Sequence, residues 1–132
     1  MTTRIHATLL ACVALFAATL SAAGDQTPRL SRIMQEKLDH SKAILGAVVK
    51  SDWRTLDAES RALVKVAQDP AWVALTAPEY LRHSDAFQKA LQQLIEASAR
   101  KDLAAASEAD VALTRSCVDC HQYVSRRRVG LF

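Results

Sequence analysis

Apolar side chains recur every three or four residues along most of the chain, which is the period of a helix with one buried face. Four segments show this period, and most are bounded by residues that favour a helix end. No run of alternating apolar and polar residues indicates a half-buried strand. We therefore expect an all-α chain that folds as an antiparallel four-helix bundle with short connections.

The first expected helix covers about residues 28–50, with Thr27 as its cap and Pro28 in its first turn. Met34 marks the centre of its apolar stripe, and Ser41 is the small polar member of that stripe. The remaining members fall within about 40° of Met34 at 100° per residue: Leu30, Leu38, Leu45 and Val48.

The second expected helix covers residues 53–68. Asp52 is its predicted cap, and the pair Asp69–Pro70 ends it, because a residue that precedes proline avoids helical geometry. A loop over residues 71–77 is expected to follow. The inner face of this helix is predicted to hold Trp53, Leu56, Ser60, Val64 and Ala67.

The third expected helix begins at a capping box made by Thr76 and Glu79 and reaches about Arg100. Its inner side is predicted to hold Tyr80, Phe87, Leu91, Leu94 and Ser98. Asp102 is the predicted cap of the fourth helix, which reaches about residue 127, before Gly130. The inner arc of the fourth helix holds Leu103, Ala106, Asp110 and Val124.

The first 23 residues form a separate segment. Arg4 precedes an apolar run over residues 9–20, and the small residues of "SAA" follow it at 21–23, as in a secretory signal peptide cleaved after Ala23. The alternative is an uncleaved membrane anchor, but the apolar run is shorter than the roughly 18–20 residues of a spanning helix. We therefore expect residues 24–132 to form one exported domain, in the periplasm of a Gram-negative-type bacterium and without a membrane span after cleavage.

Removal of the signal segment changes the charge and the cysteine count. Loss of Arg4 leaves 16 basic and 14 acidic residues, a balance too even to indicate nucleic-acid binding. Loss of Cys12 leaves two cysteines, Cys117 and Cys120, in an oxidising compartment.

Both cysteines belong to the stretch "CVDCH", residues 117–121, which has the spacing at which c-type haem is attached. On a helix Cys117, Cys120 and His121 lie in one arc of about 100°. Two thioethers can therefore hold one edge of a covalent haem c while the His121 imidazole binds its iron.

Three other interpretations of the same stretch remain. A zinc site would need His40 or His83 as a fourth ligand. A Cys-x-x-Cys redox site normally follows a strand at a helix start, and no strand is expected here. A disulfide between helix positions i and i+3 has poor geometry.

A signal segment, a helical bundle and a C-terminal "CVDCH" together resemble the class II cytochromes c, over essentially all of residues 24–132. The stretch "IMQEKLDHSKAILGAV", residues 33–48, is similar to the first helix of the low-spin members, whose methionine binds iron. This resemblance implies Met34 as the sixth iron ligand. It also implies a periplasmic carrier of single electrons that is not an enzyme, and a candidate homodimer, since class II relatives are often dimers.

The alternative within this family is a five-coordinate, cytochrome c′-like protein that binds NO or CO. Ser125 stands where gas-binding members usually carry a basic residue, which weakens this alternative. Two alternatives to Met34 remain for the sixth iron position: it is empty, or it is filled by His83 or His40. Near the haem motif, Arg126 and Arg128 are candidate contacts for the haem propionates, and neighbouring arginine charge would suit an acidic redox partner.

Overall fold

The computed structural model describes residues 26–73 and 77–129, and the side chains of residues 29–72 and 77–126. The chain divides into two compact units, Met1–Arg32 and Ile33–Phe132, and of the first unit only residues 26–32 are described. The predicted signal segment, Thr76 and Gly130 lie outside the described residues. The architecture below concerns the second unit.

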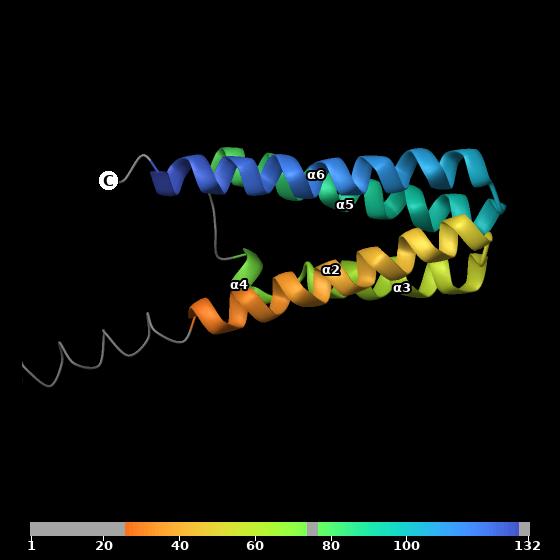
Figure 1. Cartoon of the computed structure of the whole chain (residues 1–132), viewed down its shortest axis with the longest axis horizontal. Coiled ribbons are helices and arrows are strands. Elements are labelled where there is room, and N and C mark those ends of the chain that lie inside the picture. Colours follow the sequence, from red (N-terminus) through yellow and green to blue (C-terminus); the bar gives the residue numbers. More distant parts are fainter. Residues whose placement is uncertain (1–25, 74–76, 130–132) are drawn as a thin grey trace, which may run out of the picture. The chain divides into compact units, whose positions relative to one another are not determined.

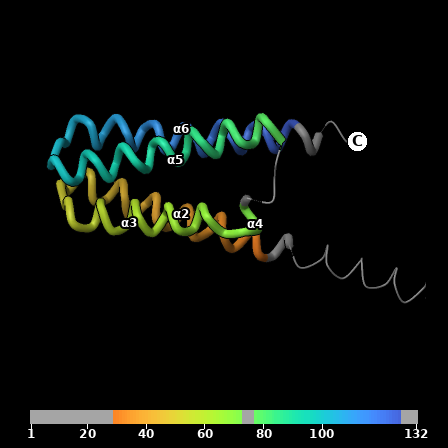
Figure 2. The backbone as a smooth tube through the Cα atoms, turned by 180° about the vertical axis from the view of Figure 1, so that it is seen from behind, coloured from red at the N-terminus to blue at the C-terminus, as the bar shows by residue number. Residues whose placement is uncertain are grey.

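Helices are the regular secondary structure of the described residues, which contain no strand, as the sequence predicts. The elements are α2 (Gln26–Lys50), α3 (Trp53–Val66), α4 (Pro70–Val73), α5 (Pro78–Arg100) and α6 (Leu103–Val129). From Ile33 onward the helices form a bundle in which α2 runs antiparallel to α3, and α5 antiparallel to α6 (Figures 1 and 2). Helix α5 packs against both α3 and α6.

Both helical pairs are joined by the same tight turn, repeated fifty positions apart. Ser51 and Lys101 adopt positive φ angles of 54° and 53°. In each turn the next residue, Asp52 or Asp102, caps the following helix: its carboxylate accepts a hydrogen bond from the backbone N–H three residues later, at 3.1 Å and 3.0 Å. The two predicted aspartate caps are therefore confirmed.

Three predicted boundaries are wrong. Helix α2 begins at Gln26, so Thr27 lies within the helix; Pro28 is tolerated there because the first helical N–H groups have no intrahelical partner. Ala77 precedes α5 at φ −59° and ψ 132°, the extended geometry required before proline, and it caps the helix without a side-chain bond. The predicted loop after Pro70 contains the short helix α4.

The core of the second unit is formed by α2, α3, α5 and α6, and α2 contributes Ile44, Ala47 and Val48. On α5 the predicted inner side is confirmed, since Tyr80, Phe87, Leu91, Leu94 and Ser98 are all buried. On α3 and its C-cap the prediction is confirmed for Leu56, Ser60 and Ala67, which are buried together with Leu63. The other two predicted residues, Trp53 and Val64, are partly buried and pack against the same core. The buried cluster also includes Ala90, Ala97, Ala106, Ala109 and Leu113.

The buried face of α2 is rotated from the predicted one. Leu38 and Leu45 are 51% and 53% exposed, whereas Ile33, Lys37 and Ile44 are buried. At 100° per residue this face is centred about 80° away from Met34. The hydrophobic pattern predicted the wrong face of α2 because it treats Lys37, a charged residue, as exposed to solvent.

One smaller difference concerns α6. Leu103 is exposed rather than on the inner arc, while Ala106 and Asp110 are buried as predicted. Burial raises the pKa of the Asp110 carboxyl.

Of the helices that the structure describes, none combines the length and apolar composition needed to cross a bilayer.

Candidate functional site

Five residues from three helices gather near the two cysteines of α6, and we call these seven residues the aromatic–thiol cluster. Helix α6 contributes the cysteines, and α2 contributes one lysine. Helices α4 and α5 supply the aromatic rings and one hydroxyl. The members are Lys37, Trp72, Tyr80, Ser84, Phe87, Cys117 and Cys120.

The two thiols share one side of α6, because they lie nearly one turn apart, and this side faces the interior of the bundle. Cys120 is 8% exposed, and Cys117 is half-buried against the hydrophobic core. Both thiols are free. Burial raises the pKa of each, and the nearby Lys37 charge only partly opposes this effect. Such thiols are mostly protonated at neutral pH, unlike the low-pKa nucleophile of a Cys-x-x-Cys redox site.

Lys37 is the unexpected member of the cluster. Its side chain is only 6% exposed, and its Nζ lies 3.0 Å from the centroid of the Trp72 ring and 4.3 Å from that of Phe87. No described residue accepts a hydrogen bond from this Nζ. Burial lowers the pKa of Lys37 to about 8, and the two cysteines partly oppose the shift. The aromatic faces supply its main electrostatic compensation.

Trp72 is held in place by two hydrogen bonds to α5. Its indole Nε1 donates to Ser84 Oγ at 3.2 Å, and its carbonyl accepts from the Tyr80 hydroxyl at 3.2 Å. The Trp72 and Tyr80 rings pack at a centroid distance of 5.1 Å. Burial raises the pKa of Tyr80, so its hydroxyl remains a donor. These contacts fix α4 over the cluster, in line with a covering role for Trp72.

The two predicted iron ligands lie at the edge of the buried region. His121 is exposed on α6, one residue beyond the buried Cys120, so the predicted arc runs from the interior to the surface. Met34 is half-buried on α2, one turn before Lys37. Arg126 is exposed, and the side chain of Arg128 lies outside the described ones.

The other two histidines lie in different surroundings. His83 is half-buried on α5, with its ring 5.4 Å from that of Tyr123. His40 is half-buried on α2, and its Nδ1 lies 2.6 Å from Glu59 Oε2 on α3. Among the described residues, no three His, Cys, Asp or Glu side chains are grouped to hold a metal ion, so the zinc interpretation gains no support.

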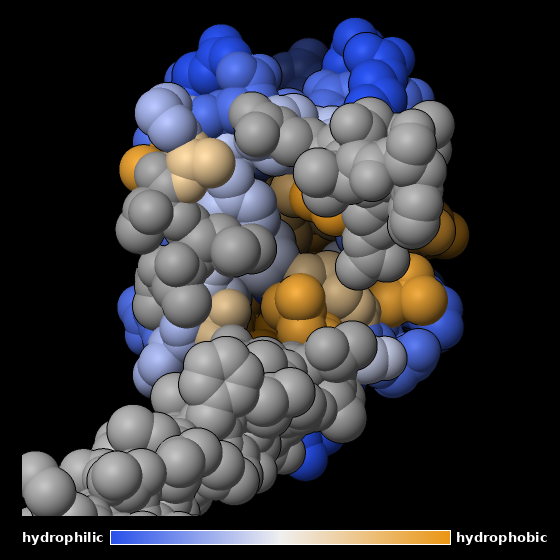
Figure 3. Space-filling view, turned by 90° about the vertical axis from the view of Figure 1, so that its left-hand side faces the viewer, coloured by the Kyte–Doolittle hydropathy of each residue, from blue (hydrophilic) through white to orange (hydrophobic). Residues whose placement is uncertain are grey.

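A covalent haem fits the donor set of the aromatic–thiol cluster. Two protonated thiols lie on the inward side of α6, aromatic rings are grouped with them, and the buried ammonium of the same cluster has no hydrogen-bond partner among the described residues. Figure 3 looks at the end of the bundle where α4 lies; hydrophobic side chains (orange) gather on one side of a recess there, and paler, more polar ones lie on the other. Cys117 and Cys120 would hold the porphyrin edge, and His121 would bind the iron.

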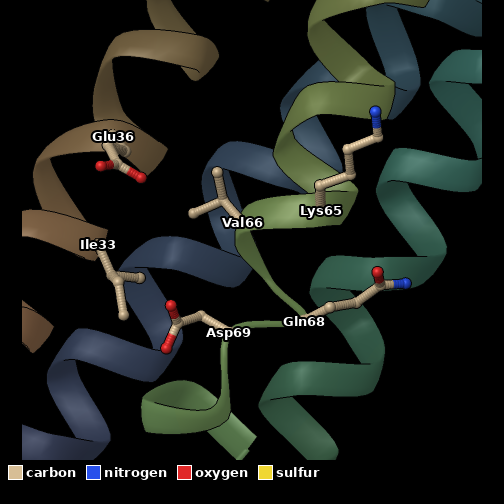
Figure 4. A pocket seen from close by; sticks show the side chains of 6 residues that line it. All are labelled: Ile33, Glu36, Lys65, Val66, Gln68 and Asp69. Atoms are coloured by element: carbon tan, nitrogen blue, oxygen red, sulfur yellow. The ribbon is translucent and has the colours of Figure 1, made fainter.

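A separate pocket lies between α2 and the end of α3, with a volume of about 340 Å³. Ile33, Val66 and Asp69 point toward one another there, while Lys65 and Gln68 extend away (Figure 4). Its remaining lining residue is Glu36, so this pocket contains none of the residues predicted to bind haem.

Lys37 was missed by the sequence analysis, although the sequence carries a signal for it. Ile33, Lys37, Ile44 and Val48 have the spacing of one helix face, and only the charge of Lys37 argues against including it. The sequence also carries a signal for the two matching turns of the fold, since an aspartate cap occurs at Asp52 and again fifty residues later at Asp102.

We compared the chain with models of protein families, with curated proteins and with solved structures, and found no match.

Proposed function

We propose that this chain is an exported c-type cytochrome that carries single electrons. Cys117 and Cys120 would hold a haem covalently, and His121 and Met34 would bind its iron. The observation that supports this most directly is the pairing of two inward-facing, protonated thiols with the adjacent His121 in the attachment spacing. Resemblance to the low-spin class II cytochromes c gives Met34 its role.

Bound haem c supplies an iron that alternates between the ferric and ferrous states. The chain holds it covalently, so the cofactor is not lost in an extracytoplasmic compartment. Trp72, Tyr80 and Phe87 exclude water from one side of the site, and the Met34 thioether favours the ferrous state. If His121 and Met34 both bound the iron, no position on it would remain open to a substrate, and the protein would transfer electrons without catalysing a reaction of its own.

The function is tested on protein produced in a host that attaches haem to exported chains. We expect one haem per chain that stays with the polypeptide in acidified organic solvent. We also expect a reversible one-electron titration, and a ferrous form that binds carbon monoxide slowly or incompletely at neutral pH. A chain that leaves such a host without covalent haem contradicts the proposal.

A gas-binding haem protein is the second candidate, and one observation favours it. The buried face of α2 is centred on Ile33 and Lys37, and Met34 is only half-buried beside it. If Met34 stays at that edge when haem is bound, the sixth position is open to CO or NO.

The variant Met34→Ala separates the two candidates. If Met34 binds the iron, its removal converts the haem from low to high spin, abolishes the weak near-infrared band of methionine-bound ferric haem, and allows rapid binding of carbon monoxide. Leu38→Ala is the matched control, because Leu38 lies one turn further on the same helix and is exposed. An unchanged spectrum in Met34→Ala, or the absence of that band in the wild type, assigns Met34 to packing and favours the gas-binding candidate.

A further inference from the structure

Lys37 carries a positive charge in the interior of the bundle, beside the two cysteines. Lys37 is 6% exposed, and its buried ammonium lies over the rings of Trp72 and Phe87 and donates no hydrogen bond to a described residue. An uncompensated buried lysine destabilises a fold, since desolvation of the ammonium is unfavourable. A role in the site explains why a lysine stands there.

Lys37 lies close enough to Cys117 and Cys120 for its charge to act on both thiols. A haem held by these two cysteines would therefore have this charge near it.

We propose that Lys37 sets the reduction potential of the haem, with its interior charge favouring the ferrous over the ferric state. This inference rests on the proposed function. When one electron enters from a donor protein, the iron loses one unit of positive charge and no bond is made or broken. A fixed cation nearby repels the ferric iron more strongly than the ferrous iron, and the low dielectric of a buried site preserves that difference.

The groups that face Lys37 do not cancel its charge. From α6 they are the two cysteines, which become uncharged thioethers once haem is attached. From α4 and α5 they are the neutral rings of Trp72 and Phe87. On α3, Glu59 contacts α2, but its carboxylate pairs with His40 and not with Lys37.

The same charge makes the potential depend on pH. Burial lowers the pKa of Lys37 to about 8. Below this pH the ammonium is charged and favours the ferrous state; as pH rises through the pKa the charge is lost and the potential falls. Reduction above pH 8 is accordingly coupled to uptake of a proton by Lys37.

The test is a mediated redox titration of the haem-loaded wild type, Lys37→Met, Lys37→Arg and Lys42→Met. Lys42→Met is the matched control, because it removes the same charge from an exposed position of the same helix. At pH 7 we expect Lys37→Met to lower the ferrous-to-ferric ratio roughly tenfold at a fixed electrode potential, which corresponds to a midpoint shift of about 59 mV for one electron. Lys37→Arg and Lys42→Met should stay within about threefold of the wild type.

Between pH 7 and pH 10 the wild-type potential should fall, while that of Lys37→Met should not. A flat wild-type profile overturns the inference even if the methionine variant fails to fold. Equal shifts in Lys37→Met and Lys42→Met also overturn it, because a solvent-exposed charge would then act as strongly. Covalent haem with an unchanged potential refutes the role of Lys37 alone, whereas a chain without covalent haem refutes the proposed function as well.

Discussion

Replacing Cys117 and Cys120 together by serine is expected to abolish covalent haem attachment completely. A hydroxyl adds to the haem vinyl groups far less readily than a thiol, so neither thioether can form. Both positions keep a small side chain on the same face of α6, so the packing of that helix is largely retained. The measurement is the mass of the exported chain and the retention of haem in acidified organic solvent.

Single variants and one neighbouring residue make this experiment specific. Cys117→Ser and Cys120→Ser should each leave one thioether and give protein with reduced yield. Ser116→Ala is the control, because Ser116 is buried next to the motif, is not itself a thiol, and donates a hydrogen bond to the Leu113 carbonyl at 2.7 Å. Covalent haem in the double variant would show that these cysteines are not the attachment sites.

The second large effect is expected for Leu91→Ala. Leu91 is fully buried on α5, the helix that packs against both α3 and α6. Truncating its side chain leaves a cavity in the main core, and we expect the free energy of unfolding to fall by about 3 kcal/mol. The measurement is a denaturant titration followed by circular dichroism, with both proteins in the same haem state.

Leu81→Ala is the control for this experiment. Leu81 lies on the same helix and is 45% exposed, so its truncation should change the free energy of unfolding by less than about 0.5 kcal/mol. Equal destabilisation by the two variants would contradict the placement of the core on the inner face of α5.

Helix positions followed from the sequence because their ends carry local signals. Asp52 and Asp102 each cap a helix through a bond to the third residue onward, and such a bond depends on neighbouring residues alone. The inner face of α5 was predicted for a similar reason, since most of its large apolar residues share one side. The start of α5 was mispredicted because Thr76 and Glu79 match a capping box, whereas the geometry before Pro78 places Ala77 at the cap.

The interior of the site depended on contacts that no local pattern encodes. Lys37 is buried because Trp72 on α4 and Phe87 on α5, distant in sequence, provide aromatic faces for its ammonium. The exposure of His121 likewise depends on how α6 is rotated against its neighbours. The attachment motif was visible at once, because three chemically distinctive residues at a fixed spacing are a strictly local signal.

The repeated turn between paired helices bears on how quickly the bundle folds. At both turns the chain reverses within two residues, through hydrogen bonds that run from Ser51 and Asp52, or from Lys101 and Asp102, back to the preceding helix. Reversal over so few residues requires little loop-closure entropy, so each hairpin can form before the two meet. Much of the contact network is therefore close in sequence, and helical chains of such low contact order fold in microseconds to milliseconds. Docking of the second hairpin onto the first then brings Cys117 and Cys120 of α6 up to Lys37 of α2, so the site is completed in the last step of folding.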